Sequence, residues 1–201
     1  MRTTSIALLL FVCISILSRA QDVNLEKTGD TPVGAKFTSG GQIRMDICPS
    51  QLDVSGSDEN QVRISYYLDD RDDDRDSDVK VGLRISGDHA DVKVTRCPQN
   101  NFHVKLEVPR SSNLYVRMFA GQFNLLGITG DKDIELHAGQ LTIDVGKPED
   151  YFRVDASLLT GDLQASAFNV SKSGLFRSFE QGGPGKYRLH VHVGAGQITL
   201  R

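Results

Sequence analysis

Tryptophan is absent from the 201-residue sequence, whose aromatic rings are supplied by 9 Phe and 5 Tyr. Carbohydrate-binding modules typically stack sugars on exposed rings, so the missing tryptophan argues against a typical module of that kind. Positive charge is also scarce, because 23 Lys and Arg face 26 Asp and Glu for a net charge of −3. Nucleic acids and anionic lipids bind to cationic surfaces, and we therefore expect neither as a partner.

Long apolar runs are nearly absent too. The exception, Ile6–Leu17, is too short to cross a bilayer comfortably. A positive charge precedes it and the small residues Ser18 and Ala20 follow it, which is typical of a secretory signal peptide. We expect residues 1–20 to be removed, so that the mature chain begins at Gln21 without a stable membrane span. Its expected location is extracytoplasmic: the periplasm, the cell surface or the medium.

Cysteine is equally scarce. Of three cysteines one lies in the signal peptide, which leaves Cys48 and Cys97 in the mature chain. In an oxidising compartment an even pair predicts a disulfide, and two separate buried thiols are the alternative. Cysteine metal sites generally use a CxxC pair, which the mature chain lacks. No metal site is expected from these residues.

No stretch carries the apolar periodicity of a helix. Residues 21–36 are polar and unpatterned, which predicts a flexible lead-in. From there on apolar and polar residues alternate, as at Ile43, Met45 and Ile47. Short alternating runs separated by Gly, Pro, Asp and Ser indicate strands joined by turns. The pattern predicts a single all-β domain over residues 37–201.

An acidic segment, Asp69–Asp78, interrupts the alternation with seven aspartates. Strand-like runs flank it, so we expect the solvated tip of a hairpin. A weak calcium site is the alternative, but a looped calcium site needs a glycine to turn the chain. The segment contains none.

The second half of the chain repeats one pattern, apolar–x–apolar–x–small–Gly–Gln/Asp–apolar–x–apolar. The alternation slips by one residue at the shared glycine, which is how a strand bends while keeping its apolar side toward one core. The four copies are Val116–Leu125, Ile134–Ile143, Ala156–Ala165 and Val191–Leu200, and their glycines are Gly121, Gly139, Gly161 and Gly196.

Repeats of this length, with two short strands each, fit the rungs of a β-solenoid. We predict a solenoid-like stack in the C-terminal half and antiparallel hairpins in the N-terminal half. An antiparallel β-sandwich is the alternative. Stacking in register would bury three columns: Ala120/Ala138/Thr160/Ala195, Met118/Leu136/Leu158/Val193 and Phe123/Leu141/Leu163/Ile198.

Several consecutive runs together follow one pattern: apolar-x-Val-Pro, a spacer, a strand, Gly, a second strand and Gly. They are Phe102–Pro109, Leu114–Val116 with Gly121, and Gly127–Asp131 leading into Ile134–Leu136. In this pattern, and in its expected export signal, the chain resembles the bacterial putative-adhesin domain family. The resemblance covers residues 37–201, most clearly 102–200. It implies an exported β-solenoid-like domain and supplies no set of catalytic residues.

Motifs for catalysis are missing as well: the sequence has no Gly-x-Ser-x-Gly and no phosphate-binding glycine loop. His190 and His192 share one face of a strand, and the predicted register places them beside Asp133 and Glu135. That set resembles a metal site, but an exposed polar strand face is the favoured interpretation. We expect no catalytic residue, no metal and no cofactor.

One strand face combines rings with a cation: Tyr115, Arg117 and Phe119 alternate along it. We predict that these three residues bind a ligand, through stacking and cation–π contacts. The expected function is that of a non-catalytic cell-envelope or surface protein, adhesin-like or structural, whose partner is an envelope or surface protein or a glycan. An enzyme acting on polysaccharide, built on a short solenoid, is the alternative.

Overall fold

The computed structural model describes residues 21–25, 33–68, 79–98 and 101–201. The predicted signal peptide and the predicted hairpin tip at Asp69–Asp78 lie outside them. The described residues confirm the all-β prediction, since their only helices are two single 3-10 turns, η2 (Pro148–Asp150) and η3 (Ser166–Phe168). No helix among these residues is long and apolar enough to span a membrane.

Thirteen strands form one sheet that folds over on itself into two layers. The strands are β1 (Gln21–Leu25), β2 (Val33–Lys36), β3 (Gln42–Ile47), β4 (Gln51–Ser57), β5 (Gln61–Leu68), β6 (Lys80–Ser86), β7 (His89–Thr95), β8 (Phe102–Pro109), β9 (Asn113–Leu126), β10 (Lys132–Ile143), β11 (Tyr151–Ala165), β12 (Val170–Gly182) and β13 (Tyr187–Leu200).

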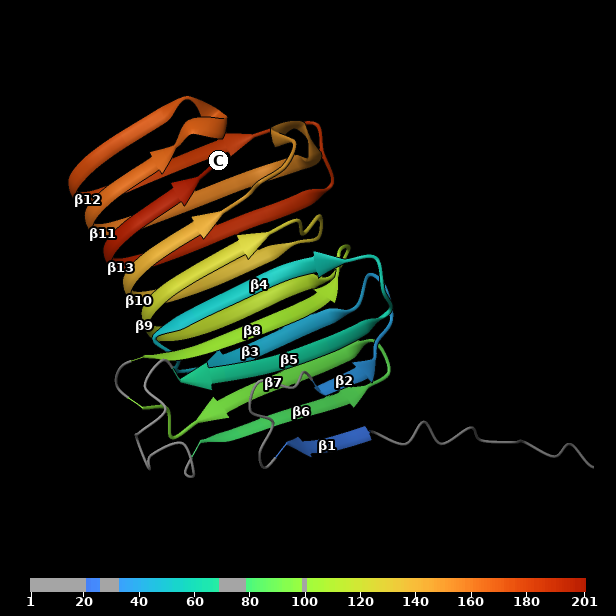
Figure 1. The fold of residues 1–201 in the computed structure, drawn as a ribbon. Coiled ribbons are helices and arrows are strands. Elements are labelled where there is room, and N and C mark those ends of the chain that lie inside the picture. The colour runs from blue at the N-terminus through green and yellow to red at the C-terminus, as the bar shows by residue number, and fades with distance from the viewer. Residues whose placement is uncertain (1–20, 26–32, 69–78, 99–100) are drawn as a thin grey trace, which may run out of the picture.

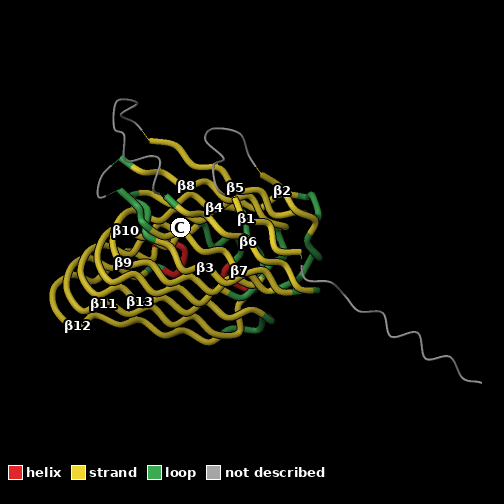
Figure 2. Tube along the Cα trace, turned by 90° about the horizontal axis from the view of Figure 1, so that it is seen from below, coloured by secondary structure: helices red, strands yellow, loops and turns green. Residues whose placement is uncertain are grey.

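The long strands β9, β10, β11 and β13 each contribute to both layers. The first arm of β9 pairs with β3, and its second arm pairs with β4. The first layer therefore continues through β3, β7, β6 and β1, and the second through β4, β8, β5 and β2. Figure 1 shows the strands stacked along one axis, and Figure 2 shows their bends nested on one side with the two layers apart. The apolar core lies between the layers.

Each long strand bends at a corner of three residues that ends in the shared glycine. In β9, Met118 is buried before the corner and Phe123 after it, while Phe119 and Ala120 face outward. The four corner glycines have φ between +130° and +140°, a region that favours glycine because it has no Cβ. The predicted bend at the repeat glycine is thus present in every copy.

The predicted register is confirmed, but the predicted burial is wrong for one column. Ala138 pairs with Ala120 and Ala195, and Thr160 pairs with Ala195. Yet Ala120, Thr160 and Ala195 are exposed and Ala138 is half-buried. The alternation of buried and exposed side chains stops over all three corner residues, whereas the sequence predicted a shift of one residue. The second corner position, which forms this column, therefore lies on the outer surface. The other two predicted columns are buried.

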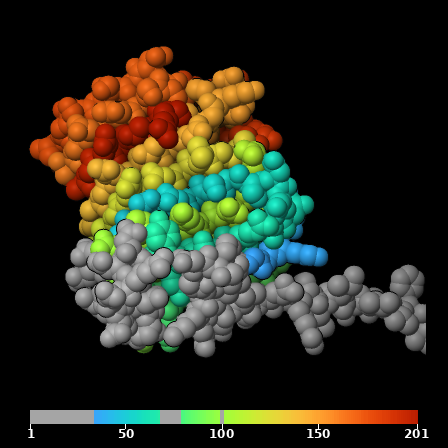
Figure 3. Space-filling view, viewed as in Figure 1, coloured from blue at the N-terminus to red at the C-terminus, as the bar shows by residue number. Residues whose placement is uncertain are grey.

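The order of the stack differs from the order of the repeats. β13 lies between β10 and β11 and pairs in parallel with both. β12 pairs antiparallel with β11 and ends the stack. In Figure 3 the red surface of β13 accordingly appears between the bands of earlier strands. Because the repeats have similar pairing edges, each can pair with any other, and the order of the repeats in the sequence does not determine their order in the stack.

A fifth copy of the repeat is formed by β3 and β4. Ile47 pairs with Met118 and Leu52 with Phe123, so Cys48, Pro49 and Ser50 make the corner. The sequence hid this copy because Ser50 replaces the glycine. The copy also continues the parallel stack into the N-terminal half, beside the predicted antiparallel pairs such as β6–β7.

The lead-in predicted at residues 21–36 is partly wrong. Gln21–Leu25 pairs antiparallel with β6, and Val33–Lys36 pairs antiparallel with β5. Backbone pairing needs no apolar pattern when a sheet edge offers unpaired N–H and C=O groups. Each short strand covers the edge of one layer, so these residues belong to the sheet.

The stack is closed at its other end by inward charges. Lys172 and Arg177 occupy positions on β12 that pair with the buried Leu163 and Leu158. The Lys172 ammonium donates to the Ser178 carbonyl at 2.6 Å, and the Arg177 guanidinium donates to that of Ser173 at 2.6 Å. Inward charges on an edge strand oppose the addition of a further strand. β12 is therefore a polar cap.

Replacing Leu136 with alanine is expected to lower the free energy of unfolding by about 2–5 kcal/mol, because its side chain is 1% exposed in a close-packed column. Urea denaturation of the mature chain measures the change. Leu159→Ala is the matched control, since Leu159 is 47% exposed and should cost less than about 1 kcal/mol. Equal losses in both variants would contradict the burial described here.

Candidate functional site

The outer face of the first layer carries a charged ladder, defined here as one side chain from each of five neighbouring strands. Arg117 pairs with Asp46 on one side and with Glu135 on the other. His192 follows Glu135, as the sequence predicted. In stacking order the charged ladder is Asp46, Arg117, Glu135, His192 and Ser157.

Arg117 is the central cation of the charged ladder. Its Nε lies 3.0 Å from a carboxylate oxygen of Glu135, and its Nη1 lies 3.1 Å from one of Asp133. The arginine side chain is 44% exposed, so each pair contributes only about 0.2–1 kcal/mol to stability. The pairs instead fix the direction of the guanidinium and neutralise its charge.

A second row runs beside the ladder, at the first position of each corner. In stacking order this corner row consists of Cys48, Phe119, His137, Gly194 and Leu159. Phe119 is 72% exposed, and its ring stacks on His137 with centroids 5.1 Å apart and planes 12° apart. Gly194 adds no side chain, because a Cβ there would overlap the His137 carbonyl. The Phe119–His137 stack is therefore open on both sides.

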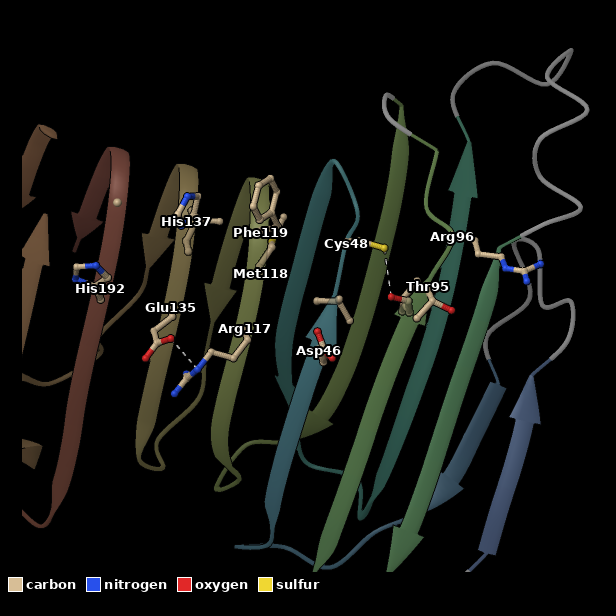
Figure 4. A pocket seen from close by; sticks show the side chains of 14 residues that line it. Asp46, Cys48, Thr95, Arg96, Arg117, Met118, Phe119, Glu135, His137 and His192 are labelled. Carbon is tan, nitrogen blue, oxygen red and sulfur yellow. Dashed lines mark hydrogen bonds and ion pairs between the residues drawn. The ribbon is translucent and has the colours of Figure 1, made fainter. Parts of the chain in front are cut away.

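An open groove of about 580 Å³ lies along the charged ladder and the corner row, across β7, β3, β9, β10 and β13. Arg117, Phe119, Glu135 and His137 line it (Figure 4), and Arg96 closes the end toward β7. A second hollow of about 590 Å³ adjoins it at Cys48 and Phe119. Phe119 is thus the ring shared by both hollows.

The disulfide predicted between Cys48 and Cys97 is confirmed, with the Cα atoms 5.7 Å apart. It joins the corner of β3–β4 to the segment between β7 and β8. That segment is longer than the neighbouring corner of β3–β4. Met45 pairs with Val92 and Leu52 pairs with Val104, so seven residues on one side correspond to twelve on the other. The bond holds this longer segment against one end of the groove.

This chain shares its fold with a putative cell adhesion protein. The solved structure of that protein, from Clostridium sporogenes, matches with a TM-score of 0.51 and 11% sequence identity, over 85% of this chain and 98% of the other. No protein-family model and no curated protein matches the sequence. At 11% identity this likeness shows the fold and no family.

The three predicted binding residues lie on one strand face, and two of them line the groove. Arg117 and Phe119 do so, while Tyr115 lies outside it, beside Asp133 on β10. Sequence reasoning missed Asp46 and Arg96, which come from β3 and from the end of β7. Only the hidden fifth repeat would have placed Asp46 beside Arg117.

The predicted neighbours of the histidines are also confirmed, since His190 pairs with Asp133 and His192 with Glu135. Asp155, on the other side of His190, has a pKa below its usual range because Arg153 donates a hydrogen bond to it. Within the part of the chain that is described, no three His, Cys, Asp or Glu side chains converge in a way that would hold a metal ion.

A buried cation, Lys132, lies at the opposite end of the strands from the corners. Its side chain is 1% exposed and donates to the Gly130 carbonyl at 2.9 Å and to the Tyr151 hydroxyl at 2.8 Å. The tyrosine donates in turn to the Val145 carbonyl at 3.1 Å. Burial lowers the pKa of Lys132 to about 8 and raises the pKa of Tyr151.

We expect the free energy of unfolding to rise between about pH 8 and pH 10, by roughly 3 kcal/mol at most. The unfolded chain keeps Lys132 protonated up to its ordinary pKa of 10.5, whereas the folded chain releases the proton near 8. Above pH 10 the raised pKa of Tyr151 reverses the trend, because the unfolded tyrosine ionises first. Urea denaturation across this pH range measures it. Lys132→Met should abolish the rise, and an unchanged profile in that variant would assign the effect to other groups.

Proposed function

We propose that this protein is an exported, non-catalytic component of the cell envelope or surface, adhesin-like, which binds a partner through the groove beside the charged ladder. The partner contacts the stack of Phe119 on His137 and the side chains of Arg117 and Glu135. The repeats form the scaffold, and their outward side chains form the binding face. A repeated scaffold with a variable face suits binding.

The exposure of Phe119 is the observation that supports this proposal most. Exposed aromatic rings in a partly enclosed site are typical binding hot spots. Here the ring is 72% exposed, is held in place by His137, and borders two hollows. A partner that covers it gains buried apolar area without a large loss of side-chain freedom.

Export is supported by the Cys48–Cys97 disulfide, because such bonds persist in oxidising compartments. The fold shared with a putative cell adhesion protein agrees with an adhesin-like role.

Fluorescently labelled mature protein, residues 21–201, tests the proposal by its binding to envelopes isolated from the organism that produces it. Phe119→Ala should weaken binding by about thirtyfold, as a hot spot of some 2 kcal/mol would. Phe176→Ala is the matched control, because Phe176 is 77% exposed on β12 outside the groove. Equal binding by both variants would refute the site, and turnover of envelope polysaccharide by the purified protein would favour the enzyme instead.

A further inference from the structure

We infer that the groove binds a neutral glycan chain that runs across the strands, with one sugar ring stacked on the free face of Phe119. This inference rests on the proposed function and names the class of its ligand. Three features of the groove support it: the balance of its charges, the orientation of the Phe119 ring, and its direction across the face of the sheet.

The charges that line the groove cancel one another, because Asp46 and Glu135 face Arg96 and Arg117. Lys93 lies 3.9 Å from Asp46, and Arg117 is paired with Glu135 at 3.0 Å. Hydrogen-bond acceptors and donors therefore alternate along the groove: Asp46 accepts, Arg117 donates and Glu135 accepts. A charged ligand would meet as much repulsion as attraction here. Sugar hydroxyl groups both donate and accept, so they fit an alternating row without carrying charge.

The orientation of Phe119 leaves one ring face free. His137 is stacked on the face toward β10, at 5.1 Å and nearly parallel. That separation is close to the distance between neighbouring strands, so the imidazole on β10 covers one face of the phenyl ring. The opposite face therefore points toward β3, where the next residue of the corner row is Cys48, with no ring. The second hollow lies on this side, between Phe119 and the Cys48–Cys97 bond, while the groove extends to both sides of the stack.

The space beside the free face suits one ring. β9 and β7 are separated by two strand spacings, about 10 Å, with Cys48 of β3 between them. Phe119 bounds this space on one side, and Thr95 and Arg96 bound it on the other. A sugar ring stacked on Phe119 would lie over Cys48, which lines both hollows between these strands.

The direction of the groove favours a glycan over an extended peptide. The groove crosses five strands, or about 19 Å, on the face of the sheet. Extended peptides commonly bind by adding a strand to a sheet edge, where backbone groups are unpaired. On this face the strands are already paired with both neighbours, so a peptide backbone would find no such partners. A glycan needs only side-chain hydrogen bonds and a ring face.

The test uses labelled mature protein and three portions of the producing organism's isolated envelopes: untreated, oxidised with periodate, and digested with proteinase. Periodate cleaves vicinal diols and so destroys most sugar rings. We expect periodate to lower binding at least tenfold and proteinase to leave it unchanged. Loss of binding after proteinase but not after periodate would overturn the glycan and leave the proposed function standing. Failure to bind untreated envelopes would refute the proposed function itself.

Salt and one conservative variant complete the experiment. Binding of a neutral ligand should change less than twofold between low and high salt, whereas a tenfold fall would indicate a charged ligand and overturn the neutral assignment. Phe119→Tyr keeps the ring face and should retain binding to untreated envelopes, while Phe119→Ala should lose it. Equal loss in both variants would show that ring stacking is not the contact.

Discussion

Replacing Gly139 with alanine is expected to lower the free energy of unfolding by at least about 4 kcal/mol, or to prevent folding. Two costs combine at this residue. Its φ of +134° is strained for any residue with a Cβ. The added Cβ would also overlap the carbonyl of Gly121 on the neighbouring strand. Because that neighbour is backbone, the two corners would have to separate.

The same contact repeats through the stack, so the damage should spread. A Cβ on Gly196 would overlap the carbonyl of Gly139, and one on Gly161 would overlap that of Gly196. The corners of β9, β10, β13 and β11 are thus packed glycine on glycine. Separating one pair of corners also separates the arms on either side of it, which hold the buried columns.

Gly146→Ala is the control that separates the two costs. Gly146 also has a positive φ, +68°, but no atom lies within 4 Å of a Cβ built there. Its substitution should therefore cost only the backbone strain, about 1–2 kcal/mol. Chemical denaturation of the mature proteins measures both variants. Similar losses for Gly139→Ala and Gly146→Ala would show that the close packing of the corners contributes little.

Removal of the Cys48–Cys97 bond is the second large effect. The bond closes a loop with a sequence separation of 49 residues, for which chain entropy gives about 4 kcal/mol. Cys48→Ser with Cys97→Ser should lose that amount in urea denaturation. Reducing agent should have the same effect on the unaltered protein and none on the double variant. An unchanged unfolding midpoint in reducing agent would contradict the prediction.

The register of the stack was predictable because glycine marks each bend. Where the glycine is present, as at Gly121 and Gly139, the paired columns followed directly from the sequence. Where serine replaces it, as at Ser50, the copy was missed, although its alternation from Ile43 to Ile47 had been recognised. The predicted burial of the corner was wrong because the sequence cannot distinguish a one-residue bulge from a three-residue bend. Both leave the same alternation of apolar residues before and after the glycine.

The groove was only partly predictable from the sequence. Arg117 and Phe119 belong to one strand, so their common face follows from alternation. Asp46 and Arg96 come from elements more than twenty residues away in the chain, and only the stacking of β7, β3 and β9 brings them to the groove. Sequence periodicity reports which way a side chain points, but not which distant strand becomes its neighbour.

The place of β13 has a consequence for the timing of assembly. β13 is synthesised after the other described strands, yet it fills the space between β10 and β11. Until its residues emerge, β10 and β11 lack their common partner, and the core between the layers is incomplete there. We therefore expect the C-terminal stack to close only after the residues of β13 have been added.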